Sequence, residues 1–204
     1  MIHPLEEELW SRFDTILGMD EAGRGPLCGP AVVAGVIFPK GYENEIINDS
    51  KKLSEKKREA LFDQIRHDAL GYWIVMVDEE TIDTLNIYRA VQQGMEQIAK
   101  KANADFVLTD AMPLRTCDNF ESVVKGDTKS VAIAAASILA KVTRDRYMKA
   151  LDEEYPMYGL AGHKGYPTKK HLAAIEEYGV APFYRKSFGP VARLLEANRR
   201  LTLF

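Results

Sequence analysis

The stretch GMDEAGRGPLCGP, Gly18 to Pro30, places two neighbouring carboxylates between an apolar segment and a glycine-containing turn. Adjacent residues of a flat strand point to opposite faces, so Asp20 and Glu21 can serve one site only if the strand ends there. Gly23 and Gly25 supply the backbone freedom for such an ending. The stretch therefore predicts a strand end that carries a metal site. The alternative is an ordinary hairpin, in which both carboxylates are solvated turn residues.

Length and composition set the class of protein. The chain has 204 residues, 46% of them apolar, which suits a single globular domain over residues 1–204 with a substantial core. No apolar run reaches the roughly 18 residues of a membrane span. The acidic start MIHPLEEELW lacks the features of a signal peptide, so a cytoplasmic location is expected. Cys28 and Cys117 form no CxxC pair, so both are expected to be reduced, structural thiols.

Charge is distributed unevenly along the chain. The formal net charge is −3, but residues 161–200 carry eight Lys or Arg against three Glu, a local balance of 8 − 3 = +5 that leaves −8 elsewhere. A second basic cluster, KKLSEKKR, spans Lys51 to Arg58. Such clusters are usually solvated faces, but two of them around an acidic centre suit a nuclease.

The spacing of apolar residues predicts an α/β protein without repeats or linkers. Strands are predicted over 15–19, 31–38, 72–77, 106–109 and 122–124. Helices are predicted after an N-cap at Ser54, over 86–101 and over 128–154, the last apolar on most sides and therefore central. From about residue 155 to 204 the pattern indicates helices and basic loops.

Acidic residues recur at the C-terminal ends of three predicted strands: Asp20 with Glu21, then Asp110, then Asp127. In open α/β sheets, ligand sites form at that edge. Each residue has a structural alternative, since Asp110 could cap a loop and Asp127 or Thr128 could cap the long helix. Four gathered carboxylates would repel strongly unless divalent cations neutralised them, and oxygen-only ligands favour Mg²⁺ or Mn²⁺ over zinc.

The opening stretch resembles the signature of type 2 ribonuclease H, the bacterial enzyme that cuts ribonucleotides out of duplex DNA. Other segments resemble further motifs of that family in the same order. They are NDSKKLSEKKRE from Asn48, VLTDAM from Val107, KGDTKSVAIAAASILAKVTRD from Lys125, GHKGYPTKKH from Gly162 and YRKSFGPV from Tyr184. The resemblance covers nearly the whole chain, and its motifs agree in sequence and spacing.

The resemblance implies a ribonuclease H-like fold, with a central five-stranded mixed sheet flanked by helices and a helical C-terminal part. It implies that Asp20, Glu21, Asp110 and Asp127 are catalytic and hold two ions of Mg²⁺ or Mn²⁺, with Asp20 as the bridging ligand. The ions would activate a water for in-line attack on the phosphate and stabilise the leaving 3′ oxygen. The expected substrates are RNA–DNA hybrids and duplex DNA with embedded ribonucleotides. Cleavage on the 5′ side of the ribonucleotide would leave 3′-hydroxyl and 5′-phosphate ends. A monomer is expected.

Substrate choice must depend on the 2′-hydroxyl, which separates a ribonucleotide from its deoxy counterpart on the same sugar. Glycines let the backbone approach a sugar closely, so Gly23, Arg24 and Gly25 are expected to read it through main-chain hydrogen bonds. In the family, a tyrosine that matches Tyr166 shares this task, with its hydroxyl on the 2′-OH and its ring on the next sugar. The alternative for Tyr166 is a loop aromatic packed beside Pro167.

Phosphate contacts, which position a duplex without reading it, are expected from residues of the other motifs. These residues are Lys51, Ser137, Lys141 and Lys164. His163 is either a helper in these contacts or a surface histidine.

Three other functions compete with this interpretation. Type 3 ribonuclease H resembles the chain less, since the turn here reads GRGPLCGP. A dinucleotide-binding loop does not fit, because Gly23, Gly25 and Gly29 give GxGxxxG and a β-rich segment follows in place of a helix. A non-catalytic nucleic-acid-binding module would keep the basic clusters but has no use for four converging carboxylates.

The chain ends in RLTLF, with three large apolar residues where termini are usually polar. Leu201, Leu203 and Phe204 would either fold back over the core or dock elsewhere. The ending LTLF resembles the short peptide by which bacterial repair proteins bind the sliding clamp, and this implies a weak, transient clamp contact.

Overall fold

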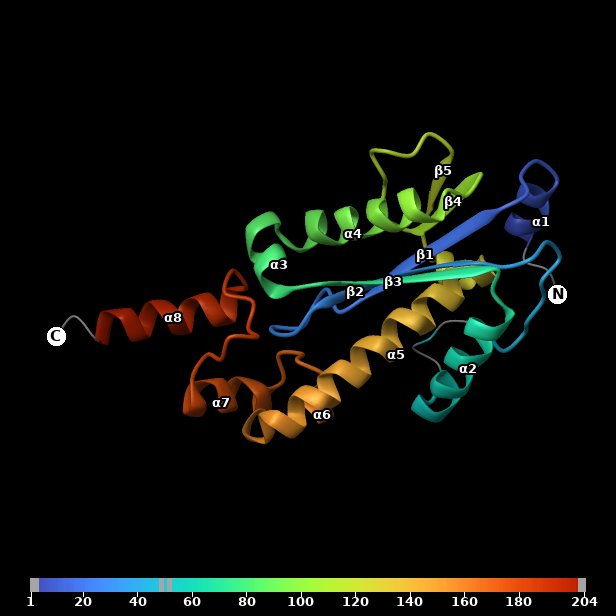
Figure 1. Cartoon of the computed structure of the whole chain (residues 1–204). Helices are drawn as coiled ribbons and strands as arrows, with labels where there is room; N and C mark the ends of the chain where they lie inside the picture. Colours follow the sequence, from blue (N-terminus) through green and yellow to red (C-terminus); the bar gives the residue numbers. More distant parts are fainter. Residues whose placement is uncertain (1–3, 48–49, 51–52, 202–204) are drawn as a thin grey trace.

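The computed structural model describes residues 4–47, 50 and 53–201, and its five strands form one mixed sheet (Figure 1). They are β1 (Ile16–Ala22), β2 (Ala31–Ile37), β3 (Gly71–Val77), β4 (Phe106–Asp110) and β5 (Phe120–Val123). The order is β3-β2-β1-β4-β5, with β1 antiparallel to β2 and parallel to β4. β2 and β3 are antiparallel, whereas β4 and β5 are parallel. The predicted five-stranded mixed sheet is confirmed.

Strand β1 continues further than the sequence predicts. Its antiparallel pairing with β2 runs through Asp20, opposite Ala34, as far as Ala22, opposite Val32. The prediction that the strand ends before Asp20 is therefore wrong, because the apolar run of β2 holds β1 in register beyond that point. The parallel pairing with β4 does stop at Met19. The two carboxylates thus lie where β1 has parted from β4 but still follows β2.

Helices cover both faces of the sheet (Figure 1). α4 (Ile87–Ala102), preceded by α3 (Glu79–Leu85), lies on one face, and α5 (Val131–Glu154) with α2 (Glu55–Asp68) lies on the other. Side chains of β2 alternate between the two cores, with Val32 and Ala34 packed towards α5 and Val33 towards α4. The remaining helical elements are α1 (Pro4–Trp10), η1 (Gly126–Thr128), η2 (Pro156–Tyr158), α6 (Leu160–His163), α7 (Lys169–Tyr178) and α8 (Gly189–Leu201). The predicted helical C-terminal part is confirmed.

The long helix α5 is central, as predicted, but it begins later than expected. Its N-cap is Ser130, whose Oγ accepts a hydrogen bond from the amide of Ile133 at 3.1 Å. The interpretation of Asp127 or Thr128 as its N-cap is therefore wrong. α5 also packs tightly on β1, because a Cβ on Gly18 would lie 2.4 Å from the backbone of Ala132.

The short helix α1, which the sequence analysis missed, supplies a second cap for α5. The buried carboxylate of Glu6 accepts hydrogen bonds from the Ser130 hydroxyl at 2.8 Å and from the amides of Val131 and Ala132, each at 3.0 Å. A negative charge at a helix N-terminus satisfies amides that have no partner within the helix. Glu6 thereby ties the start of the chain to the central helix.

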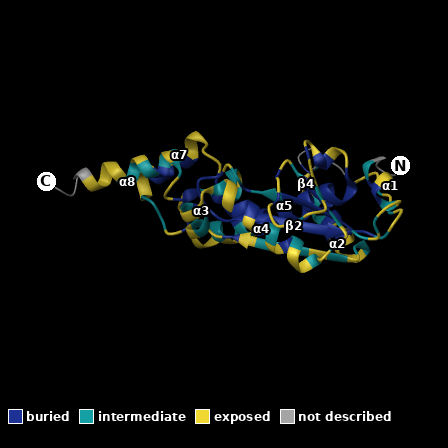
Figure 2. Ribbon diagram, turned by 90° about the horizontal axis from the view of Figure 1, so that it is seen from above, coloured by how far each residue is buried: buried dark blue, intermediate teal, exposed yellow. Residues whose placement is uncertain are grey.

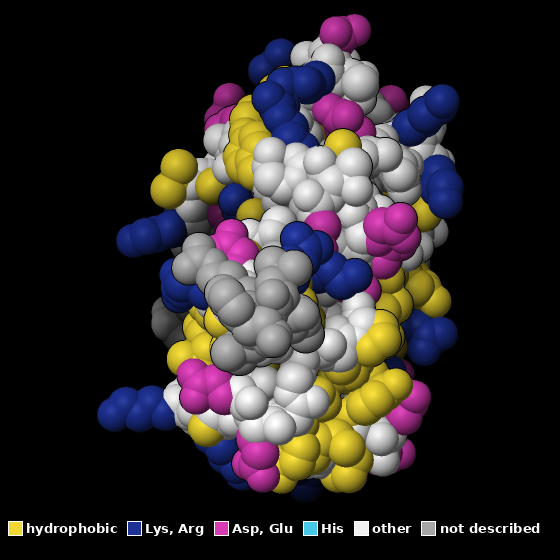
Figure 3. Space-filling view, turned by 90° about the vertical axis from the view of Figure 1, so that its left-hand side faces the viewer, with side chains coloured by type: hydrophobic (Ala, Val, Ile, Leu, Met, Phe, Trp, Pro, Cys, Tyr) yellow, Lys and Arg dark blue, Asp and Glu magenta, His cyan; other side chains and the backbone are white. Residues whose placement is uncertain are grey.

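The C-terminal region does not present one continuous basic surface. Arg185, one of its basic residues, is completely buried. On the face seen from the α8 end, Lys and Arg side chains alternate with Asp and Glu (Figure 3). α8 extends away from the sheet and is exposed over residues 196–199 (Figure 2). Among the described residues, no helix is both long and apolar enough to cross a membrane.

Candidate active site

A pocket of about 260 Å³ lies where β1 and β4 separate, beside the glycine turn and α5. Its lining residues are Asp20, Glu21, Ala22, Gly23, Arg24, Gly25, Ser50, Asp110, Ser137, Lys141, Arg144 and Tyr166. Most of the site residues predicted from the sequence therefore line one cavity. The loop that follows β1 leads into the strand β2. A dinucleotide-binding loop would lead into a helix, so the structure agrees with the sequence prediction that this loop is not one.

Asp20 lies buried in this pocket. Its side chain is 6% exposed, and its Oδ1 accepts a hydrogen bond from the amide of Glu21 at 2.7 Å. Burial raises the pKa of Asp20 well above its usual range, and the negative charges of Glu21 and Asp110 raise it further. The alternative of solvated turn residues is therefore wrong for Asp20.

Two of the other carboxylates are held by polar neighbours. Glu21 Oε1 forms an ion pair with Arg24 Nη1 at 3.3 Å. Asp110, the last residue of β4, accepts a hydrogen bond on Oδ1 from the amide of Gly126 at 2.8 Å. This bond places the turn η1 against the end of β4.

Asp127 lies in the turn η1, which contacts Asp110 through Gly126. It is 5% exposed within η1, next to Gly126, and it is not one of the described residues that line the pocket. It follows the end of β5 at Val123 after a short turn.

The pocket has the chemistry of a divalent cation site, although its carboxylates are not drawn into a tight cluster. In the part of the chain that the structure describes, no three His, Cys, Asp or Glu side chains form a metal-binding group. The available ligands are carboxylate oxygens, which Mg²⁺ and Mn²⁺ prefer. The mutual repulsion that raises the pKa of Asp20 is also what a bound cation would relieve. Asp20, Glu21 and Asp110 are the three carboxylates that line this pocket among the described residues.

Tyr166 lies beside the glycine turn. Its side chain is 46% exposed, and a Cβ on Gly25 would lie 3.3 Å from its Cε1 atom. The ring therefore lies close against the backbone at Gly25. Tyr166 also lines the pocket, so it is exposed to whatever the pocket binds.

The predicted phosphate-contact residues differ in their placement. Ser137 lines the pocket and its Oγ lies 2.8 Å from Ser50 Oγ, whereas Lys141 lines it while paired with Asp145 at 2.6 Å. Lys164 does not line the pocket, and its Nζ donates to the Ala161 carbonyl. Lys51 lies outside the described residues.

His163 is neither a surface histidine nor a pocket residue. Its Nε2 donates to the carbonyl of Tyr158 at 2.9 Å, and its Nδ1 accepts from the amide of Gly165 at 3.2 Å. Both ring nitrogens are thereby engaged by the backbone. The imidazole shapes the loop that precedes Tyr166.

Sequence reasoning missed Ser50 and Arg144 as pocket residues. Arg144 could have been found, because Ser137, Lys141 and Arg144 follow the i, i+4, i+7 spacing of one helix face. Ser50 belongs to the NDSKK motif, but its approach to α5 depends on a tertiary contact that no local pattern shows.

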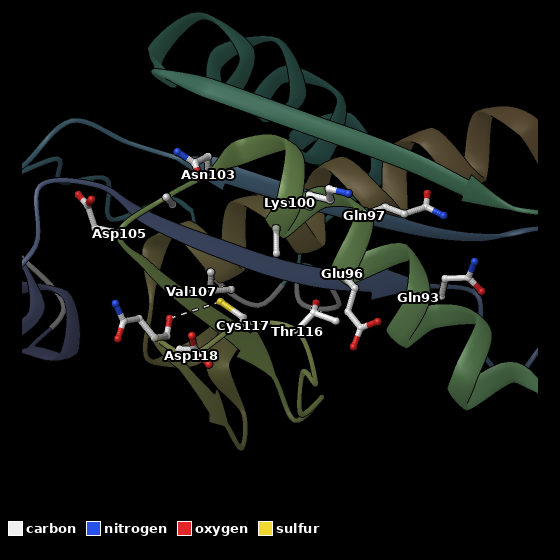
Figure 4. A pocket seen from close by; sticks show the side chains of 13 residues that line it. Gln93, Glu96, Gln97, Lys100, Asn103, Asp105, Val107, Thr116, Cys117 and Asp118 are labelled. Carbon is white, nitrogen blue, oxygen red and sulfur yellow. Dashed lines mark hydrogen bonds between the residues drawn. The ribbon is translucent and has the colours of Figure 1, made fainter.

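A larger cavity of about 730 Å³ lies between α4 and residues 116–119 (Figure 4). It opens at the beginning of β4, near Asp105, whereas Asp110 stands at the other end of that strand. None of the predicted site residues lines it in the described part of the chain. Its Cys117 is a free thiol, and burial raises its pKa, which makes it a poor nucleophile. The smaller pocket, which carries the predicted carboxylates, is therefore the candidate active site.

Comparisons with known proteins find similar chains that cover most of this one. The family model for ribonuclease HII matches residues 17–191. The ribonuclease HII of Acholeplasma laidlawii is 50% identical over 194 residues, covering 94% of this chain and 96% of its own. The ribonuclease H2 of Pyrococcus horikoshii has a similar fold, with a TM-score of 0.75 at 24% identity over 91% of this chain and 99% of its own. Ribonuclease HII of Archaeoglobus fulgidus, solved in complex with PCNA, gives a TM-score of 0.75 at 27% identity over 88% and 96% of the two chains.

Proposed function

Because the chain belongs to the ribonuclease HII family and is therefore a metal-dependent endoribonuclease, we propose that it acts at this pocket on RNA–DNA hybrids and on single ribonucleotides in duplex DNA. The observation that carries the proposal is that the buried Asp20, the carboxylates of Glu21 and Asp110 that repel it, a glycine turn and a tyrosine all line one cavity. The carboxylates suit phosphodiester hydrolysis, and the turn and the tyrosine suit recognition of a sugar.

Two ions of Mg²⁺ or Mn²⁺ are the proposed cofactors, held by Asp20, Glu21, Asp110 and Asp127. When bound, they would activate a water for attack on the phosphate and stabilise the leaving 3′ oxygen. Asp20 is the proposed shared ligand, because burial and the negative charges of Glu21 and Asp110 raise its pKa, which a bound cation would oppose. The bond from Gly126 to Asp110 supports a role for Asp127, which follows Gly126 directly.

The substrate's sugar and phosphates have separate proposed contacts. Gly23, Arg24 and Gly25 would bind the 2′-hydroxyl through the main chain, and Tyr166 would close over the sugar beside them. Phosphate contacts are proposed for four residues that need not read the sequence. They are Ser137, Lys141, Lys164 and Lys51. Ser137 and Lys141 line the pocket, whereas Lys164 is not among its lining residues and Lys51 lies outside the described part of the chain.

The chemistry of the product ends tests this proposal. Attack by water breaks the bond between phosphorus and the 3′ oxygen of the preceding deoxynucleotide, which leaves a 3′-hydroxyl there and a 5′-phosphate on the ribonucleotide. A labelled duplex with one ribonucleotide should therefore give an upstream fragment that a polymerase extends without further treatment. A 2′,3′-cyclic phosphate on the ribonucleotide would contradict the proposal, because it would make the 2′-hydroxyl the nucleophile.

We also propose that the chain works as a monomeric, single catalytic domain in the cytoplasm, where a bacterial enzyme meets duplex DNA. Size-exclusion chromatography with light scattering tests the oligomeric state. A mass of about twice 22.9 kDa would contradict the monomer.

A weak contact of the C-terminal tail with a sliding clamp is a second proposal. The support is the LTLF ending together with the complex known for the Archaeoglobus fulgidus relative. Residues 202–204 lie outside the described residues, as does the side chain of Leu201. An exposed Leu-x-Leu-Phe ending could insert into a preformed apolar pocket.

Deleting residues 201–204 separates a docking tail from one that covers the core. A docking tail predicts an unchanged melting temperature and unchanged cleavage, with loss of binding to the purified bacterial clamp. A clear drop in melting temperature would indicate that the tail packs on the core. Absence of clamp binding by the intact chain at tens of micromolar would end the docking proposal.

A further inference from the structure

We propose that Arg144 and Arg185 are positioning residues that hold the Gly23–Pro30 turn with its amide groups facing the pocket. The inference rests on the proposed function, because it explains what would orient the amide groups of this turn towards the sugar of the substrate. Both arginines are buried, with 1% and 0% of their surface exposed. They come from different elements, Arg144 from α5 and Arg185 from the segment before α8.

Arg185 binds the turn through backbone carbonyl groups. Its Nε and Nη2 donate to the Gly29 carbonyl at 2.9 and 2.7 Å, and its Nη2 donates to the Gly23 carbonyl at 2.8 Å. Its Nη1 donates to the carbonyls of Arg24 and Pro26 at 3.2 and 2.9 Å. One guanidinium thereby gathers carbonyl oxygens from both ends of the turn.

Arg144 binds two further carbonyls of the turn and links it to the tyrosine loop. Its Nε donates to the Pro30 carbonyl at 3.0 Å and its Nη2 to the Cys28 carbonyl at 3.1 Å. Its Nη1 donates to the carbonyl of Lys164 at 2.9 Å. Arg144 therefore fixes the glycine turn relative to the loop that carries Tyr166.

These contacts determine where the amide groups of the turn point. In a trans peptide the carbonyl of one residue and the amide of the next point in opposite directions. With the carbonyls of Gly23 and Arg24 turned towards Arg185, the amides of Arg24 and Gly25 point away from it. Neither amide has a hydrogen-bond acceptor among the described residues, and both residues line the pocket. Adjacent outward amides suit the oxygen of a sugar hydroxyl or a phosphate.

The same arginines explain the glycine at position 23 and the close approach of Tyr166 to Gly25. A Cβ on Gly23 would lie 2.1 Å from Arg144 Nε, so no other residue leaves room for the guanidinium. The amide of Leu27 donates to the Gly165 carbonyl at 2.8 Å, which is a second bond between the turn and the tyrosine loop. The position of the tyrosine loop beside the glycine turn is therefore fixed by buried contacts.

A lysine could not replace either arginine in this role. The guanidinium offers five donors in a fixed planar fork, whereas an ammonium offers three donors around one atom. Burial lowers the pKa of Arg185 to about 10, so it stays protonated at neutral pH. Asp83 anchors the segment, accepting hydrogen bonds from the amides of Lys186 and Ser187 at 2.8 and 2.9 Å.

The test compares Arg144→Lys and Arg185→Lys with Arg146→Lys, a matched control from α5 whose side chain forms an exposed ion pair with Glu59. Steady-state cleavage of a duplex with one ribonucleotide gives kcat and KM for each protein. We expect kcat to fall about 10–100-fold in the two test variants, because a small misplacement of a positioning group costs that much, with KM within about threefold. The control should match the wild type. Test variants that melt cooperatively and keep kcat within twofold would overturn the inference.

If the variants do not fold, the NMR amide signals of the wild-type protein test the inference. NMR spectra are recorded in EDTA, so that the substrate stays intact, with a duplex that holds one ribonucleotide and with its all-deoxy counterpart. The amides of Arg24 and Gly25 should shift with the first duplex and much less with the second, and equal shifts would overturn the inference. A wild-type protein that does not cut the ribonucleotide duplex in Mg²⁺ or Mn²⁺ would instead overturn the proposed function.

Discussion

Replacing Asp110 by asparagine is expected to lower cleavage of a ribonucleotide-containing duplex by about 10³-fold, while duplex binding stays within a few-fold. The loss follows from removing an anionic ligand at the end of β4, where about 4 kcal/mol of transition-state stabilisation would depend on the bound ions. The measurement is single-turnover cleavage at saturating Mg²⁺. Asp118→Asn is the matched control, because Asp118 is an exposed carboxylate in the β4–β5 connection. An Asp110→Asn variant that cleaves at the wild-type rate would contradict the carboxylate assignment.

Asp20→Asn should cause a similar loss of activity with no loss of stability. Burial and neighbouring charges raise the pKa of Asp20 in the folded protein, so its ionised form is less favourable there than in the unfolded chain. Without metal, the folded state therefore loses stability as pH rises from the unfolded pKa towards the folded one. Asparagine removes this penalty, so the metal-free melting temperature at neutral pH should hold or rise. A clear drop would show that Asp20 has a structural role.

The second large effect is expected at Tyr166. Tyr166→Ala should lower kcat at a single embedded ribonucleotide by about 10–100-fold while changing duplex affinity less than about threefold, because phosphate contacts dominate affinity. The Tyr166 ring lies beside Gly25 in the pocket and is not packed into the core, so its loss should affect the reaction more than the stability of the fold. Tyr166→Phe separates the hydroxyl from the ring.

Two comparisons make the Tyr166 result specific. Tyr178→Ala is the matched control, because Tyr178 is 52% exposed on α7 and does not line the pocket. An all-RNA strand paired with DNA shows whether preference for an RNA–DNA junction has been lost. Equal losses of binding and rate in Tyr166→Ala would indicate a packing role.

The sequence predicted the site more fully than it predicted the local backbone. Asp20, Glu21, Asp110 and Tyr166 could be selected because acidic residues follow apolar strands and because the motifs resemble one family. The place where β1 ends could not be predicted, since pairing with β2 carries the strand on to Ala22.

Contacts between distant parts of the chain account for most of what was missed. In the sequence, Glu6 is one of several acidic residues near the N-terminus, where solvent exposure would be expected. In the structure, its carboxylate caps a helix that begins at Val131. Arg185 reads as one basic residue among several, yet it is buried against carbonyls of the glycine turn. Charge patterns in a sequence show which residues are ionisable, but they do not show which of them the fold will bury.

The most direct test of the central claim is cleavage of duplex DNA that contains a single ribonucleotide, with protein stripped of metal by EDTA and then given Mg²⁺ or Mn²⁺. The account predicts no incision without metal and, once metal is restored, incision on the 5′ side of the ribonucleotide. The all-deoxy duplex should stay intact under both conditions. Incision by the metal-free protein, or failure to cut the ribonucleotide duplex in either metal, would contradict the account.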